Sequence, residues 1–186
     1  DPAIVNLSAF ETFYEEKRPF FIEGSNIFTF GYGGSNNNWG FNFSVPELFY
    51  SRRIGRPPQG YVTIPGYVDY PSETRILGAA KLSGKIDETW SVGLLSSLTE
   101  RTFATVQTES GERINQEVEP LTHYGVFRTQ KEFNSGKQAL GLIITTVNRD
   151  LKDDNLSTIL SNQAYTYGID GWTYLDNDET YVLTGS

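Results

Sequence analysis

The stretch RILGAAKLSGKIDETWSVGLLSSL, residues 75–98, predicts two antiparallel β-strands joined by a tight turn. In the first half, even positions carry apolar residues or glycine and odd positions include three basic residues. In the second half, Trp90 and Leu94 share one face, and small or polar residues share the other. Successive side chains of a strand point to opposite faces, so this alternation gives one apolar and one polar face. Asp87 and Glu88 supply the turn.

The same period of two recurs further along the chain. It extends over residues 138–149 and 163–175 and, after an acidic turn at 176–179, over 181–185, whereas residues 121–133 alternate less cleanly. These segments predict a mainly β fold in which an antiparallel meander occupies residues 75–186. The strand pattern reaches the last residues, so the predicted meander has open edges that a partner chain or further strands would cover.

Residues 1–74 lack this period and form a separate region. Ser8 and Glu11 match a helix capping box, and Pro19 is expected to end the short helix that follows. Residues 23–74 are rich in glycine, asparagine and proline and predict irregular structure with short strands.

Two architectures explain the alternating strands. One is a soluble β-sandwich with one face in water. The other is a transmembrane β-barrel whose apolar face meets lipid and whose polar face lines a lumen, with residues 1–74 as a plug. Strands of about ten residues, tyrosines near strand ends and glycine or serine on the polar face favour the barrel.

Composition excludes several classes of function. The chain of 186 residues has a formal charge of −8, which disfavours a nucleic-acid partner because that needs a basic surface. Cysteine is absent, and His123 is the one histidine, so no metal or cofactor site is predicted. We interpret His123 as a strand residue on a polar face. Methionine is also absent, which indicates a processed chain or part of a longer one.

Several motifs occur in a fixed order along the chain. They are DPAIVNLSAFETF (1–13), EKRPFFIEG (16–24), LFYSRRIGR (48–56), ILGAAKLSG (76–84), WSVGLL (90–95), VEPLT (118–122) and VNRDL (147–151). Together they resemble a bacterial family of unknown function, common in Bacteroidota, that follows a family 9 carbohydrate-binding module. The resemblance covers essentially the whole chain.

This resemblance implies a large barrel in the bacterial outer membrane, in contact with its lipid, and a role in carbohydrate binding or glycan uptake. The carbohydrate-binding module would precede Asp1, so its sugar-binding role is not assigned to these residues. The family supplies no catalytic residues, and none is assigned here.

Charged and aromatic residues of the first region form the candidate ligand site. A charge facing lipid at mid-depth costs about 2–4 kcal/mol, so these charges are expected inside the barrel. Arginine forks could there bind carboxylates bidentately, either as a structural plug or along a substrate path. The candidate residues are Glu16, Lys17, Arg18, Glu23, Trp39, Arg52, Arg53 and Arg56.

Two alternative functions remain open. A soluble β-sandwich could bind carbohydrate by stacking exposed aromatic residues such as Trp39 on sugar rings. An O-glycosyl hydrolase would need two carboxylates flanking the scissile bond, for which Glu16 and Glu23 on either side of Pro19 are the candidates.

Overall fold

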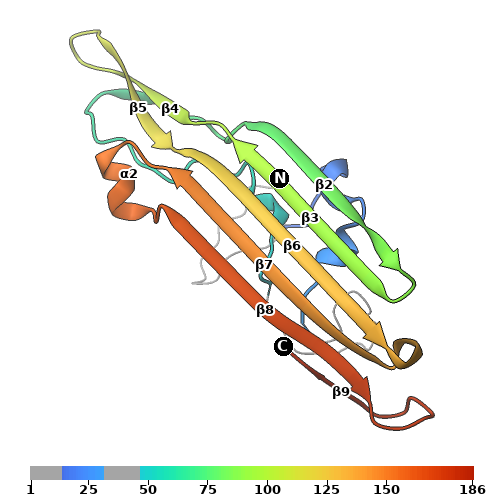
Figure 1. Cartoon of the computed structure of the whole chain (residues 1–186). Helices are drawn as coiled ribbons and strands as arrows, with labels where there is room; N and C mark the ends of the chain where they lie inside the picture. Colours follow the sequence, from blue (N-terminus) through green and yellow to red (C-terminus); the bar gives the residue numbers. More distant parts are fainter. Residues whose placement is uncertain (1–13, 32–46) are drawn as a thin grey trace.

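The computed structural model describes residues 14–31 and 47–186, which form two antiparallel sheets (Figure 1). The elements are α1 (Pro19–Ile22), η1 (Ser25–Phe28), η3 (Ser51–Arg53), β1 (Tyr67–Asp69), β2 (Ile76–Asp87), β3 (Trp90–Thr99), β4 (Thr102–Gln107), β5 (Arg113–Glu119), β6 (Leu121–Phe133), η4 (Asn134–Gly136), β7 (Gln138–Asp150), α2 (Asp154–Ile159), β8 (Gln163–Tyr174) and β9 (Val182–Gly185). The predicted mainly β, antiparallel fold is confirmed. No helix of the described residues is long and apolar enough to cross a membrane.

The larger sheet has six strands in the order β2-β3-β6-β7-β8-β9. Every neighbouring pair is antiparallel, and β6 and β7 pair in continuous register from Leu121↔Asp150 to Phe133↔Gln138. The turn between them uses positive φ angles at Asn134, Ser135 and Gly136, and asparagine and glycine adopt such angles more readily than most residues. The predicted meander is therefore present.

The smaller sheet was not predicted from the sequence. It has the order β1-β4-β5, and β4 and β5 form a hairpin inserted between β3 and β6 (Figure 1). Its strands bury Ala104, Val106 and Val118 together with the polar Gln116 and Glu119. Gln116 of β5 is buried, and its Oε1 is satisfied by a hydrogen bond of 3.0 Å from the Thr63 N–H.

The two faces of the six-stranded sheet differ in kind. On β3, Trp90, Leu94 and Leu98 are exposed, whereas Gly93 and Leu95 are buried, as the alternation predicts. We call the face with Trp90, Leu94 and Leu98 the exposed face, and the face with Gly93 and Leu95 the covered face. Further large apolar side chains of the exposed face are Leu82, Leu140, Tyr165, Tyr167, Ile169 and Leu183.

Residues of the first region pack against the covered face and close the core there. Phe21, Phe28 and Phe30 form one cluster with buried strand residues that include Leu95 and Ile143. Glycines on the strands make this approach possible. A Cβ atom at Gly93 would lie 2.8 Å from Ile27 Cγ2, and one at Gly168 would lie 2.6 Å from Leu48 Cδ1.

The start of the chain differs from the prediction. The helix expected from Ser8 lies largely outside the described residues. Pro19 was expected to end a helix, but α1 begins there, and Arg18 before it is extended with ψ 119°. The ring of proline fixes φ near its helical value and disfavours the helical region for the preceding residue, so proline suits the first position of a helix.

Asp153 lies in the connection between β7 and β8, where it acts as a helix cap. Its carboxylate accepts hydrogen bonds from the Asn155 and Leu156 N–H groups and thereby caps α2. Asp and Asn favour turns and helix N-termini for the same reason, since their short side chains bond nearby backbone donors.

Candidate functional site

A cavity of about 480 Å³ lies among the charged residues of the first region. We call it the arginine pocket. It collects six of the eight candidate residues, and Tyr14 and Tyr50 contribute to the same lining. These six are Glu16, Lys17, Arg18, Arg52, Arg53 and Arg56.

Glu16 is held at the pocket wall by charge-assisted hydrogen bonds. Arg18 donates from Nε to Glu16 Oε1 at 2.8 Å and from Nη2 to Oε2 at 2.7 Å. The Ser51 hydroxyl donates to Oε2 at 2.6 Å. Burial acts to raise the pKa of the Glu16 carboxyl, but the hydrogen bonds from Arg18 and Ser51 outweigh it and lower this pKa from 4.5 to about 2.

The same arginine joins the two segments of the first region. Arg18 Nη1 donates to the Ile54 carbonyl at 2.6 Å, and Nη2 donates to the Ser51 carbonyl at 3.0 Å. Arg52 Nη1 donates to the Glu15 carbonyl at 2.7 Å, and its guanidinium lies over the Tyr14 ring. The pocket is therefore built from segments that lie over thirty residues apart in the chain.

Two candidate residues lie elsewhere. Glu23 is exposed at the end of α1, outside the pocket lining, and its carbonyl accepts a hydrogen bond from Lys81 Nζ. Trp39 lies outside the described residues.

A buried ion pair lies on the covered face and was missed from the sequence. Arg128 of β6 donates from Nη1 to Asp170 Oδ1 at 2.7 Å and from Nη2 to Oδ2 at 2.8 Å. Both side chains are 1% exposed. The Gly31 N–H also donates to Asp170 Oδ2, at 2.8 Å, which ties the first region to the sheet. The available signal was that Asp170 shares the phase of the small residues Ala164, Thr166 and Gly168 on its strand.

A second buried carboxyl lies where the two sheets meet. Glu119 at the end of β5 accepts a hydrogen bond of 2.8 Å from the Gln59 N–H. Burial raises the pKa of the Glu119 carboxyl, and it outweighs this hydrogen bond and the opposing charges of Arg56 and Arg149. Glu119 thus joins Arg128 and Asp170 as a buried charged residue.

His123 is a strand residue, as predicted, but it does not lie on the polar face. His123 lies directly opposite Leu98 of the neighbouring strand β3. It therefore shares the exposed face with that leucine. Its Nε2 lies 2.9 Å from Ser96 Oγ. In a strand, a shift of one residue moves each side chain to the other face of the sheet. Because residues 121–133 alternate less cleanly, the sequence did not reveal which face His123 occupies.

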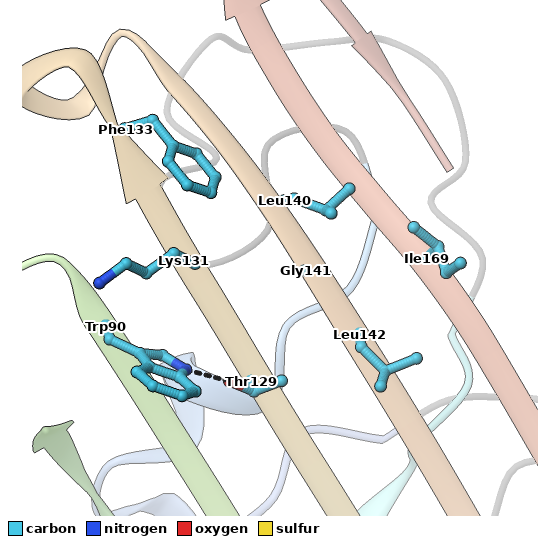
Figure 2. A pocket seen from close by; sticks show the side chains of 8 residues that line it. All are labelled: Trp90, Thr129, Lys131, Phe133, Leu140, Gly141, Leu142 and Ile169. Atoms are coloured by element: carbon cyan, nitrogen blue, oxygen red, sulfur yellow. Dashed lines mark hydrogen bonds between the residues drawn. The ribbon is translucent and has the colours of Figure 1, made fainter.

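A second cavity, of about 490 Å³, lies on the exposed face and is lined mainly by apolar side chains (Figure 2). We call it the apolar groove. Leu140, Leu142 and Ile169 line it from β7 and β8, and Trp90 and Lys131 lie at its β3 side. Trp90 Nε1 donates to Thr129 Oγ1 at 2.6 Å.

These features define a class of protein: an antiparallel β-sheet whose covered face holds the core and a buried ion pair, and whose exposed face is apolar. The chain belongs to the family described as "Domain of unknown function (DUF5916)", whose model matches residues 1–177. Searches among curated proteins and among solved structures found no match.

Proposed function

We propose that this chain forms part of the wall of a bacterial outer-membrane β-barrel, with its first region as a plug inside. The observation that carries the proposal is the exposed face, which is apolar from β2 to β9. Single exposed apolar residues are common on soluble proteins, but large contiguous patches mark contact with lipid or another protein. Leu82 on β2 is 69% exposed and Ile169 on β8 is 61% exposed, so the patch extends across the sheet.

The distribution of charge supports the same proposal. Barrels of the outer membrane place apolar residues outward and polar residues inward along each strand. The bidentate pair of Arg128 and Asp170 is on the covered face, in the middle of its strands, where a lipid-facing charge would be costly.

Strand length is also suitable. A strand tilted by about 45° needs about 9–11 residues to cross the hydrocarbon core. The five long strands of the sheet have 12, 10, 13, 13 and 12 residues, for β2, β3, β6, β7 and β8.

The sheet needs further strands to close into a cylinder. Among the described residues, β2 and β9 pair on one side only. An unpaired edge cannot face lipid, because its backbone N–H and C=O groups would lack partners there. We therefore propose that strands of a partner or of a longer chain pair with β2 and β9.

Detergent dependence tests the barrel. We expect the chain to fractionate with outer membranes, to need detergent for extraction, and to migrate faster on a gel when unheated than when boiled. Monodisperse protein purified without detergent would contradict the proposal. It would favour the soluble β-sandwich, in which a second sheet covers the apolar face.

The proposed role of the barrel is carbohydrate binding or glycan uptake. It is supported by the ordered motifs and by the arginine pocket, whose guanidinium groups suit acidic sugars. A glycan array probed with detergent-solubilised chain tests it. We expect binding that is reduced in Arg53→Ala and Trp39→Ala, while Arg75→Ala, an exposed arginine outside the pocket, binds normally. Absence of binding to any glycan would contradict this role.

Catalysis is not part of the proposal. A glycosidase needs one carboxyl that stays protonated to assist the leaving group. Because Arg18 and Ser51 hold the pKa of Glu16 at about 2, its carboxyl is ionised at neutral pH and is unsuited to that role.

A further inference from the structure

The apolar groove ends beside a pair of opposite charges. Lys131 Nζ donates to Thr89 Oγ1 at 2.8 Å and lies 3.2 Å from Asp87 Oδ2. Its ammonium also lies 5.4 Å from the centre of the Trp90 ring. Figure 2 shows this nitrogen directed toward Trp90 and away from Leu140. The side chains of Lys131 and Asp87 are 37% and 51% exposed, so both can meet a ligand.

These charges lie at one end of the strands. Asp87 is the last residue of β2, Trp90 is the first of β3, and Lys131 is close to the end of β6. Tryptophan and lysine are typical of the level of lipid headgroups, where an apolar body and a polar tip are both satisfied. The apolar side chains of Leu140, Leu142 and Ile169 continue from there toward the middle of the sheet.

The connections identify which leaflet this end faces. Residues 88–89 join β2 to β3, residues 134–137 join β6 to β7, and residues 175–181 join β8 to β9. The opposite end carries the β4–β5 hairpin and α2 (Figure 1). Outer-membrane barrels have short periplasmic turns and longer external loops. In the proposed barrel, the Lys131 end is accordingly the periplasmic one.

We propose that the apolar groove binds one acyl chain of a phospholipid from the periplasmic leaflet whose headgroup carries both a phosphate and a primary ammonium. The phosphate binds Lys131 Nζ, and the ammonium binds Asp87 Oδ2. The two side chains present opposite charges side by side, which matches the two charges of such a headgroup. This inference rests on the proposed membrane location and names the lipid that the barrel selects.

Quenching of Trp90 by brominated lipids tests the inference. The barrel, assembled with the strands that pair with β2 and β9, is inserted into phosphatidylcholine vesicles that contain either brominated phosphatidylethanolamine or brominated phosphatidylcholine. The fluorescence of the other tryptophans is measured in the Trp90→Phe variant and subtracted. We expect the ethanolamine lipid to reach half-maximal quenching at about a fivefold lower mole fraction, as one well-placed charge contact gives. Equal quenching by the two lipids would overturn the inference, and this comparison needs no variant.

Three variants locate the selectivity. Asp87→Asn keeps the Oδ1 acceptor for the Thr89 N–H and should abolish the preference for ethanolamine. Lys131→Gln should weaken quenching by both lipids. Lys137→Gln is the matched control, since Lys137 lies at the same end in an ion pair with Glu179 but outside the groove, and it should change nothing. A preference that survives Asp87→Asn contradicts the assignment. No quenching by either lipid in the parent chain contradicts the membrane proposal itself.

Discussion

Arg128 and Asp170 form two parallel hydrogen bonds, of 2.7 and 2.8 Å, across the strand that separates them. Arg128 lies on β6 and Asp170 on β8, and the pair passes over Gly141 of β7. With 1% exposure of each side chain, the two charges depend on one another for stabilisation. The Gly31 N–H bonds the same carboxylate, so the pair also anchors the first region.

Removing one charge of this pair should destabilise the fold strongly. In Asp170→Asn the guanidinium of Arg128 stays buried without a counter-ion, and we expect a loss of about 3–5 kcal/mol. The measurement is the free energy of unfolding from denaturant titration in detergent or vesicles. The double variant Arg128→Met with Asp170→Leu should recover much of the loss, because no unpaired charge remains. A loss below about 0.5 kcal/mol in Asp170→Asn would contradict this account.

Gly141 should tolerate no side chain. A Cβ atom there would lie 2.5 Å from Arg128 Nη1 and closer still to Asp170 Oδ1. We expect Gly141→Ala to cost about 1–3 kcal/mol through overpacking. Gly84→Ala on β2 is the matched control, since a Cβ at that position meets nothing within 4 Å. The two alanine variants should therefore differ in thermal midpoint, and equal midpoints would refute the crowding at Gly141.

The Glu16 carboxyl should make the stability of the fold depend on pH in the acid range. Its pKa is about 2 in the folded chain and 4.5 when unperturbed. Since the folded value is the lower one, the contribution is fully present above about pH 4.5 and is lost as pH falls toward 2. Glu16→Gln should cost about 2 kcal/mol at neutral pH and remove this part of the acid dependence. Thermal midpoints of parent and variant between pH 2 and 6 measure it, and parallel curves would contradict it.

The cost in stability of an arginine on the exposed face should depend on its depth in the membrane. Leu94 lies in the middle of β3, and Leu98 lies near its end. In lipid vesicles, Leu94→Arg should cost about 2–4 kcal/mol and Leu98→Arg about 0–1 kcal/mol. On a surface in water both would cost less than about 0.5 kcal/mol. Denaturant titration of the two variants in vesicles separates these results.

The strands of the larger sheet could be predicted because their pattern is local. Each needs only an alternation of side chains, and that alternation is visible in residues 75–98 and 138–149. The hairpin of β4 and β5 could not be found in this way. Its strands have only six and seven residues, and the buried face of β5 includes Gln116, whose side chain is satisfied by the distant Thr63.

The residues of the candidate site could be predicted from the sequence, but the contacts between them could not. The charges of residues 16–18 and 52–56 are conspicuous, and the arginine pocket does bring them together. Their pairing depends on how two irregular segments approach one another. Glu23 lies only a few residues from Arg18, yet it is outside the pocket, because α1 and the turn after it place it at the surface.

The sequence by itself determined the period of the strands, and with it the separation of apolar from polar side chains. That separation is a property of each strand alone, since neighbouring side chains point to opposite faces. Only the tertiary structure decided that Arg128 meets Asp170 and that the first region covers the face that carries this pair while the other, apolar face is exposed. Those outcomes depend on strand order and register, which join residues far apart in the chain.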